Sequence, residues 1–418
     1  MLPVLFVTAS LLIGWRYPGM LVAAAFYGFT VGAIGGTPQA TTIFVSLAVA
    51  MLMLKSLRPA MIFTVTPIDI TFLLFVGWCC LSATWQPNGN QAVATSFGFA
   101  SSTISIFLLF RVLGGLGDFG RRIVEMTVGF CLFGIVLTPL AFEAGVYAYG
   151  RLFIGNSPPV GLSQPIPYVA LSALALVVSV RRNRLATIAL AVAALSAAVA
   201  MGAATGVRGA LLATGAGVGA FLAVSGGVRS RFYTVLTLLG IGLLALLLVD
   251  QMTEIEHGLL DRLLDFGRYG STQDLSSLAR YDRYRFAWYA FEHNPVAGVG
   301  IGGFTALSGY EYPHNLFLEV ASKTGIVGLT LLGATLLATA ARARMLLATE
   351  ERWKAALFVA LLVAAFVHQQ FSFELAQGKG LFLIGLLAGW RPHASRQMAG
   401  TKTLVESGQA ATSAFSPK

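Results

Sequence analysis

The chain has 418 residues, of which 56% are hydrophobic and only 11% charged, with a mean hydropathy of +0.76. About a quarter of the residues of an average soluble domain are charged, so this composition excludes an ordinary soluble protein and indicates an integral membrane protein. The formal net charge of +10 does not indicate a nucleic-acid partner, because the basic residues lie between apolar runs in the pattern of a membrane protein.

Apolar runs of mostly about 15 to 22 residues recur from end to end, each near the length that crosses about 30 Å of hydrocarbon as a helix. Lipid cannot satisfy backbone polar groups, so we expect these runs to be helices. The predicted helices are 67–84, 91–111, 121–141, 163–180, 185–204, 209–225, 231–249, 321–341, 353–372 and 379–391.

Three further apolar runs precede these helices, at 1–13, 17–33 and 39–54. If the first two form one broken or re-entrant element, the chain has about twelve transmembrane helices and a cytoplasmic N-terminus. This is the arrangement that we predict, and three separate spans would give thirteen helices and an external N-terminus.

Six short segments between the apolar runs hold 18 of the 28 lysines and arginines. Such segments remain on the cytoplasmic side of a membrane protein, so the long polar segment 250–320 should face the periplasm of a bacterial cell. The predicted organisation has four parts: N-terminal transmembrane helices in 1–249, a periplasmic catalytic loop with amphipathic helices in 250–320, three last transmembrane helices in 321–392, and a disordered cytoplasmic tail in 393–418.

The periplasmic loop is the expected location of any chemistry, because it contains ten of the eighteen carboxylates and three of the five histidines. Elsewhere ionisable groups are sparse. The three cysteines, Cys79, Cys80 and Cys131, lie in apolar segments without metal-ligand spacing. We interpret them as buried structural thiols and predict no metal site.

Arg208 is the one ionisable residue between Arg184 and Arg229, in the segment TGVRGALLA. A charge at the membrane edge costs free energy unless it is paired, reaches the interface or faces a polar cavity. A snorkelling interface arginine is the simpler interpretation. The neighbouring Gly206 and Gly209 leave room for a large anionic partner, and they favour a functional role for Arg208.

The segment 278–293 predicts a helix, with Tyr281, Tyr284, Trp288 and Phe291 at three- and four-residue spacing. Such a basic aromatic helix often only binds lipid headgroups. Arg280 and Arg283 flank the aromatic face, and arginine offers paired donors that match phosphate oxygens at any relevant pH. The helix is therefore a candidate for holding a pyrophosphate without metal.

The next segments are NPVAGVGIGGF (294–304) and YPHNLFLE (312–319). The glycines lack the GK[ST] ending of a nucleotide site, so we expect a tight turn that lets backbone approach backbone or ligand. His314 can take or supply a proton near neutral pH, although a lone histidine is more often a structural hydrogen-bonding group. Glu319 and Lys323 fit an ordinary pair one helical turn apart, and Glu374 and Lys379 are expected to be solvated loop charges.

Taken together, these residues resemble the O-antigen ligase and O-antigen polymerase superfamily. The resemblance rests on an arginine-bearing helix followed by NP-x-x-GVG-x-GGF (294–304), HN-x-x-LE (314–319) and GIVG (325–328), with Arg208-Gly209 further upstream. The topology, with a large external loop before the last three helices, extends it over most of the chain.

The resemblance implies a periplasmic glycosyltransferase of the bacterial inner membrane that works without metal or other cofactor. Its substrates would be a glycan on undecaprenyl pyrophosphate and, for a ligase, a lipid A-core sugar, and membrane lipids would surround it. Arg208 and Arg280 carry over as pyrophosphate ligands, and His314 as the residue near the reacting centre.

One position departs from the family pattern. Relatives usually place the loop arginine about four residues before the tryptophan, where this chain has Tyr284. Arg280 keeps the spacing of about seventy residues from Arg208 and is our choice, with Arg283 as a competitor. Together with Arg283 and Tyr284, Asn315 and Trp288 complete the predicted substrate-binding set.

The predicted reaction is transfer with inversion, in which arginines stabilise the departing pyrophosphate and His314 acts as base or positions the acceptor hydroxyl. We favour a ligase over a polymerase, which would extend a second carrier-linked glycan. A lipid or glycan transporter is the alternative from another class, and it should place charges within several spans.

Overall fold

The computed structural model describes residues 2–36, 44, 47–48, 51–52, 64–86, 89–148, 151–155, 157–179, 184–225, 275–375 and 377–391. The predicted helix 231–249, the first part of the predicted loop and the tail 393–418 lie outside these residues. The described chain is helical apart from one two-stranded sheet. Eight of its helices are long and apolar enough to cross a membrane, so the chain is an all-α polytopic membrane protein.

The first two predicted runs form two helices, α1 (Leu2–Arg16) and α2 (Met20–Ile34). A Cβ on Gly35 would lie 2.1 Å from Pro3 Cγ, and one on Gly14 would lie 2.4 Å from Leu21 Cδ2. The start of α1 therefore packs against the end of α2, and the two form an antiparallel hairpin. Residues 17–19 make the predicted break between them.

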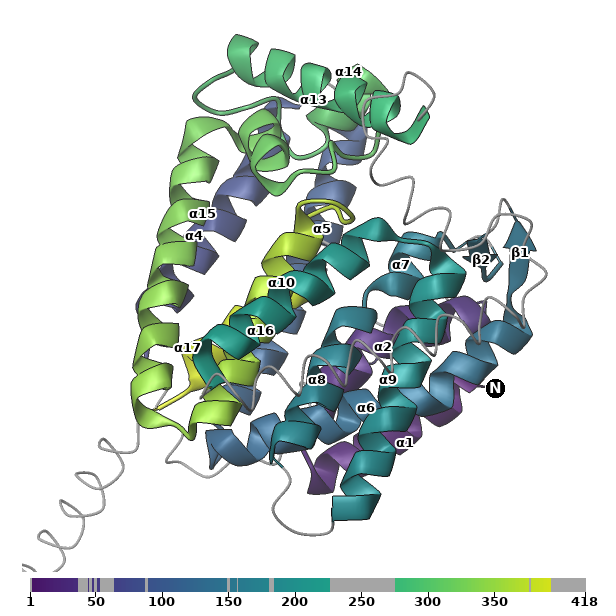
Figure 1. Cartoon of the computed structure of the whole chain (residues 1–418). Coiled ribbons are helices and arrows are strands. Elements are labelled where there is room, and N and C mark those ends of the chain that lie inside the picture. The colour runs from purple at the N-terminus through teal and green to yellow at the C-terminus, as the bar shows by residue number, and fades with distance from the viewer. Residues whose placement is uncertain are drawn as a thin grey trace, which may run out of the picture.

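The middle of the chain follows the predicted helices closely (Figure 1). Its elements are α4 (Pro67–Leu81), η1 (Ser82–Trp85), α5 (Gly89–Gly115), α6 (Phe119–Ala144), β1 (Val146–Ala148), β2 (Arg151–Phe153), α7 (Pro159–Ser163), α8 (Ile166–Ser179), α9 (Arg184–Thr205) and α10 (Arg208–Ser225). The small antiparallel sheet of β1 and β2 is the exception to the predicted all-α fold.

The last elements are α13 (Leu275–His293), α14 (Gly303–Ser308), α15 (Leu316–Thr349), α16 (Arg352–Gln369), η3 (Lys379–Leu383) and α17 (Ile384–Gly389). In Figure 1, α13 and α14 lie across one end of the membrane helices, above α15, α4 and α5. The predicted loop therefore contains helices, as expected, and its described part covers one end of the bundle.

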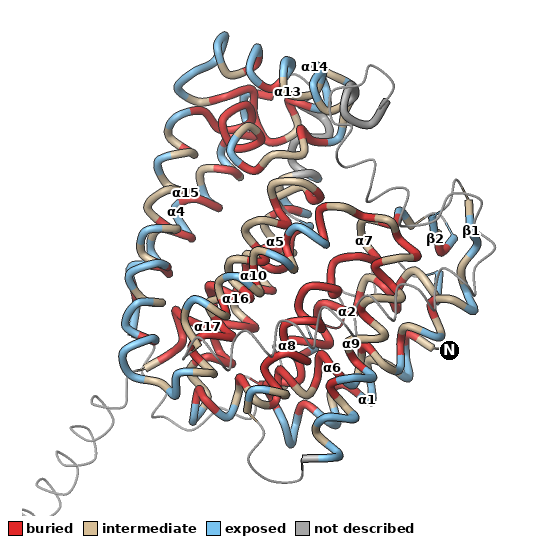
Figure 2. The backbone as a smooth tube through the Cα atoms, viewed as in Figure 1, coloured by how far each residue is buried: buried red, intermediate tan, exposed pale blue. Residues whose placement is uncertain are grey.

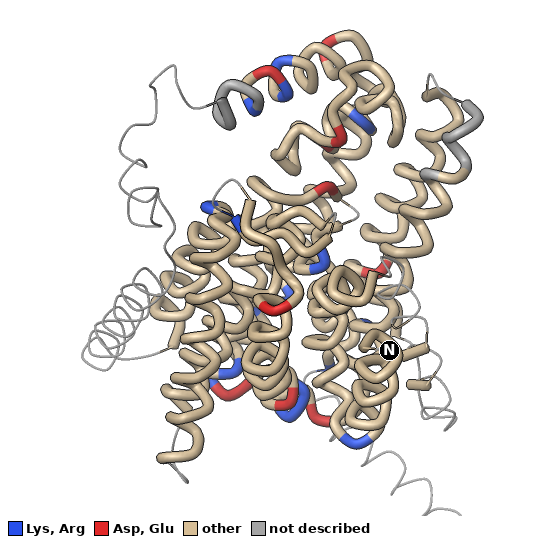
Figure 3. Tube along the Cα trace, turned by 90° about the vertical axis from the view of Figure 1, so that its right-hand side faces the viewer, with Lys and Arg blue, Asp and Glu red and all other residues tan. Residues whose placement is uncertain are grey.

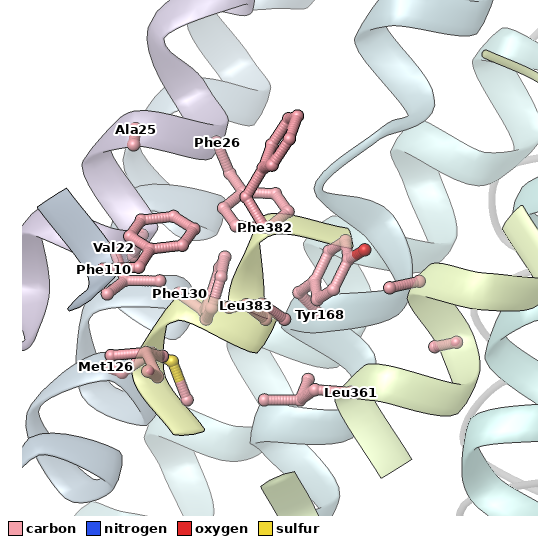
Figure 4. Close-up of a cluster of buried hydrophobic side chains, with 14 of the residues drawn as sticks. Val22, Ala25, Phe26, Phe110, Met126, Phe130, Tyr168, Leu361, Phe382 and Leu383 are labelled. Atoms are coloured by element: carbon pink, nitrogen blue, oxygen red, sulfur yellow. The ribbon is translucent and has the colours of Figure 1, made fainter. Parts of the chain in front are cut away.

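Aromatic side chains form the centre of the group of helices that contains α2, α6 and α8. The ring of Phe26 lies 4.4 Å from that of Tyr168 and 5.3 Å from that of Phe130, and Figure 4 shows the three side chains together. Figure 2 shows the buried residues on the inward sides of these helices. Close aromatic packing of this kind fixes α2, α6 and α8 relative to one another.

Charged residues lie largely towards the two ends of the helices (Figure 3). At one end, Arg111 Nε binds Asp69 Oδ1 at 2.7 Å. Glu125 similarly accepts from Arg121 and Arg122, at 2.9 and 2.6 Å. The acidic residues near the predicted helix ends thus have arginine partners, and they do not form a charged path through the membrane.

Candidate active site

Helix α15 breaks at Gly325, whose φ of 66° and ψ of −163° are not helical. The break leaves the carbonyls before it without helical donors. The backbone N–H groups of Val299 and Gly300 donate to the carbonyls of Ser322 and Lys323, both at 2.9 Å. The predicted tight turn in 294–304 is therefore a loop whose backbone approaches backbone and completes a broken helix.

This loop and break fit so closely that only glycine is accommodated at the contacts. A Cβ on Gly298 would lie 2.4 Å from the carbonyl carbon of Lys323, and one on Gly325 would lie 2.2 Å from the Val296 oxygen. The indole Nε1 of Trp78 in α4 donates to the Thr324 carbonyl at 2.9 Å. These contacts fix the start of α15, and with it the two residues that precede the helix, His314 and Asn315.

His314 and Asn315 directly precede the first residue of α15. Asn315 is the N-cap of α15, and its Oδ1 accepts from the Leu318 N–H at 3.0 Å. Asn315 is a predicted substrate-binding residue, and its side-chain oxygen is engaged in capping. His314 has a φ of 58° and is the one non-glycine residue with positive φ in the described part of the chain. Left-handed backbone costs an L-residue about 1–2 kcal/mol, and the surrounding contacts hold His314 in it.

The His314 ring lies between an aromatic ring and a backbone carbonyl. Its centroid is 4.3 Å from that of Tyr312, and Nδ1 is 3.3 Å from the Phe371 oxygen. A carbonyl oxygen only accepts hydrogen bonds, so we assign the ring proton of the neutral form to Nδ1. Nε2 then keeps its lone pair and can accept a proton from a substrate.

The surroundings keep His314 neutral. Burial, followed by the charges of Arg283 and Arg280, lowers the pKa of His314 to about 4, against a smaller opposing effect of the Phe371 hydrogen bond. Two predicted arginines of α13 therefore lie close enough to act electrostatically on the predicted catalytic histidine. At neutral pH the ring of this histidine is therefore unprotonated at one nitrogen and carries no charge.

Arg283 is the more closely held of the two arginines. Its guanidinium carbon lies 4.9 Å from the centroid of the Tyr310 ring, and its buried Nε has no hydrogen-bond partner among the described residues. Neither Arg280 nor Arg283 forms an ion pair within the described chain. Tyr284 Oη donates to the His314 carbonyl at 3.4 Å, so this predicted residue supports the histidine backbone.

Part of the aromatic face of α13 is exposed. Tyr281, Trp288 and Tyr289 are exposed, and the buried residues of the helix include Ala287 and Ala290. Trp288 donates from Nε1 to Glu292 on the exposed surface. Trp288, a predicted substrate-binding residue, thus lies on the exposed side of α13 and not on its inward side.

Arg208 begins α10, which packs tightly against the turn after α16. A Cβ on Gly209 would lie 2.4 Å from Ser372 Oγ and 3.0 Å from Phe371 Cβ. Arg208 also lines a groove of about 880 Å³ between α10 and α16, together with Leu211, Leu212, Gly215, Ala216, Val367, Gln370 and Phe371. Apart from Arg208 and Gln370, the groove is lined by apolar residues and glycine.

The turn at 371–372 is the feature that joins the predicted residues. Phe371 lines the Arg208 groove with one side and accepts from His314 with its carbonyl. Ser372 contacts Gly209 and accepts from Tyr312 Oη at 2.9 Å. Arg208 and His314 thus flank one turn, and the α13 arginines lie near His314, although these residues come from three distant parts of the sequence.

A buried ionic cluster adjoins this turn and corrects two expectations. Lys323 Nζ binds Glu319 Oε1 at 2.7 Å and Glu374 Oε1 at 2.9 Å, so Glu374 is an ion-pair partner and not a solvated loop charge. Lys379 is also buried, and its Nζ donates to the Ala25 carbonyl at 3.1 Å. Both expectations were wrong because Glu374 and Lys379 contact distant helices, α15 and α2, which sequence spacing does not reveal.

Comparison with known proteins identifies the segment that carries these residues. A family model described as O-antigen ligase matches residues 193–333. The chain therefore carries a segment of the O-antigen ligase and polymerase superfamily. The matched segment runs from within α9 into α15 and contains Arg208, Arg280, Arg283 and His314. No curated protein matches the chain.

A segment of this superfamily implies glycosyl transfer involving lipid-linked glycans, at the level of ligase or polymerase. Among the described residues, no group of three or more His, Cys, Asp and Glu side chains is arranged to hold a metal ion. The arginines of α10 and α13 suit an anionic substrate, and His314 beside them is neutral.

Proposed function

We propose that the protein is an O-antigen ligase, which transfers a glycan from undecaprenyl pyrophosphate to a sugar hydroxyl of the lipid A core. The observation that carries this proposal is a neutral His314 that lies near the arginines of α13 and shares one turn, through Phe371, with the groove of Arg208. Such a site combines a proton acceptor with donors for phosphate oxygens. The matched segment of the ligase and polymerase superfamily supports the same reaction class.

The arginines would act on the leaving group. As the bond between the sugar C1 and the pyrophosphate oxygen breaks, negative charge grows on that oxygen, and guanidinium donors placed beforehand stabilise it. Arg208 at the start of α10 and Arg280 of α13 are the proposed ligands, and Arg283 fits the same role. The apolar groove beside Arg208 would hold the first part of the polyprenyl chain.

His314 would act on the acceptor. The acceptor oxygen attacks C1 from the face opposite the pyrophosphate and forms the new glycosidic bond, with inversion at C1. Its proton passes to His314 Nε2, the ring nitrogen assigned as unprotonated. Holding the hydroxyl by a hydrogen bond to the same nitrogen is the alternative role for His314, and both roles require the neutral ring.

We place the site at the periplasmic face of the bacterial inner membrane. The exposed aromatic residues of α13 suit contact with lipid headgroups, where tyrosine and tryptophan rings are favoured. Arginine-held pyrophosphate is an activated donor that requires no nucleotide, as a periplasmic reaction demands. About twelve transmembrane helices and the division at residues 249, 320 and 392 remain our proposal for the whole chain.

Reconstitution in liposomes tests the proposed reaction. The purified protein is given an undecaprenyl pyrophosphate glycan with either lipid A core or a second carrier-linked glycan, and the product mass is measured. The proposal predicts glycan-bearing lipid A core and release of undecaprenyl pyrophosphate. Extension of the second carrier-linked glycan would identify a polymerase. Movement of unchanged substrate across the bilayer without any new product would identify a transporter.

The arginine roles are tested in the same assay. Loss of a single charge-stabilising donor costs about 10²–10³-fold in rate, so the Arg208→Ala and Arg280→Ala variants should show losses of this size. Arg285→Ala on the exposed side of α13 is the matched control and should retain its rate. If Arg283→Ala abolishes transfer and Arg280→Ala does not, Arg283 is the loop ligand.

A further inference from the structure

A second pocket lies next to the site and is distinct from the Arg208 groove. It has a volume of about 180 Å³ and lies between α4, α5 and the start of α15. Its mouth passes Ala94 and Gly98 of α5, which are both exposed. Its walls include Phe99, Ile301 and Leu375. The volume is far above the roughly 10–15 Å³ that a single water needs.

One buried polar atom of a residue that lines this pocket has no hydrogen-bond partner among the described residues. Glu319 is fully buried, and its Oε1 accepts from Lys323 Nζ at 2.7 Å and from the Leu375 N–H at 3.1 Å. Its Oε2 is buried without a hydrogen-bond partner in the described part of the chain. Leaving a buried acceptor unsatisfied is costly, and Glu319 lines the pocket. A ligand that donates a hydrogen bond there would satisfy this oxygen.

The lining indicates which kind of ligand fits. An anion is disfavoured by the carboxylates of Glu319 and Glu374, and a cation would compete with the Lys323 ammonium that already lies between them. Apolar walls with one placed acceptor suit a molecule that has both apolar faces and donor groups. A sugar ring has this character, because its C–H faces can pack on Phe99 while a hydroxyl donates to Glu319.

The position of the pocket relative to His314 indicates the role of that sugar. Phe371, at one end of the turn after α16, lines the Arg208 groove. Glu374 and Leu375, which follow this turn in the chain, line the second pocket. His314 contacts this turn through Phe371 and directly precedes the helix of Glu319. An attack opposite the pyrophosphate requires the acceptor on the far side of the reacting carbon from the leaving group.

We propose that the pocket is a subsite for a sugar residue of the glycan acceptor, with Glu319 Oε2 accepting a hydrogen bond from one of its hydroxyls. This assignment rests on the proposed glycosyl transfer and adds the location of the acceptor. It holds for a sugar of the lipid A core or of a carrier-linked glycan, since both offer the same ring and hydroxyl chemistry.

Gly98→Leu tests the pocket without touching the ionic cluster. A Cβ on Gly98 meets no atom within 4 Å, so the leucine side chain has space to enter the mouth of the pocket. We expect the acceptor KM to rise about tenfold or more, equivalent to roughly 1.4 kcal/mol, while the donor KM stays within about twofold. Gly219→Leu in α10 also faces open space and lies outside both pockets, so it should leave both constants unchanged.

Two acceptor arms identify the source of the sugar. The KM values are measured with lipid A core and with a second carrier-linked glycan, and the arm that sustains transfer in the wild type shows the effect. An unchanged acceptor KM in Gly98→Leu overturns the assignment. A rise confined to the donor KM overturns it as well, because the pocket would then hold a donor sugar.

A binding measurement separates this inference from the proposed reaction. Deacylated lipid A-core oligosaccharide and the free glycan of the carrier are each titrated against the purified wild type, and the unfolding temperature is recorded. One of them should stabilise the wild type and Gly219→Leu but not Gly98→Leu. This result supports the pocket even if no transfer is seen. Equal stabilisation of all three proteins, or of none, contradicts it.

Discussion

Replacing Gly209 with alanine should push α10 away from the turn that joins the two halves of the site. The new Cβ would lie 2.4 Å from Ser372 Oγ and 3.0 Å from Phe371 Cβ. Overpacking of this kind costs about 1–3 kcal/mol, partly offset by about 0.5–1 kcal/mol from replacing a helical glycine. Since Phe371 also holds His314, transfer should fall by at least about tenfold, as even a 1 Å displacement can cost about 10²-fold.

Gly219→Ala in the same helix is the matched control. A Cβ there meets no atom within 4 Å, so this variant should gain about 0.5–1 kcal/mol and keep its transfer rate. Thermal unfolding in detergent and transfer in liposomes are measured for both. Adding Ser372→Ala to Gly209→Ala removes the nearer clash and should restore part of the rate. Equal stability and equal transfer for Gly209→Ala and Gly219→Ala would refute the reasoning.

Two other predictions use the same assays. Transfer needs a neutral His314, whose pKa is lowered to about 4, so the transfer rate should be constant above about pH 5.5 and half-maximal near pH 4. Arg283→Gln removes one cause of the lowered pKa and should move the midpoint of this pH profile upward. A wild-type midpoint above about pH 6.5 would contradict the assignment. Gly325→Ala combines backbone strain of about 1–3 kcal/mol with overpacking of about 1–3 kcal/mol, because its Cβ would lie 2.2 Å from a carbonyl oxygen. Its unfolding temperature should fall, whereas Gly333→Ala in the same helix meets open space and should not lose stability.

The sequence predicts the membrane helices well because their determinant is local. An apolar run of sufficient length must be helical in lipid, and α5, α6, α9, α10 and α16 lie close to their predicted bounds. Short polar connections carry no such constraint. The β1–β2 hairpin and the break of α15 at Gly325 depend on contacts between distant segments, so periodicity does not reveal them.

In the candidate site, too, the sequence reveals some features and not those that depend on contacts between distant segments. The chemical character of Arg208 and His314 stands out in the sequence, because isolated ionisable residues at a membrane face are costly. The roles of the neighbouring residues do not stand out in the sequence. Asn315 caps a helix, Trp288 is exposed, and Glu374 pairs with a lysine 51 positions earlier. Each of these outcomes is set by tertiary packing, and no spacing rule in the sequence points to it.

The central claim is that Arg208 and His314 act on one reacting centre, and a double-mutant cycle tests it most directly. Initial rates of glycan transfer are measured for Arg208→Ala, His314→Ala and the combined variant at saturating donor. Residues that work as a unit show strongly non-additive losses, so the combined variant should be little slower than the slower single variant. Full transfer by either single variant, or losses that simply multiply, would contradict the account.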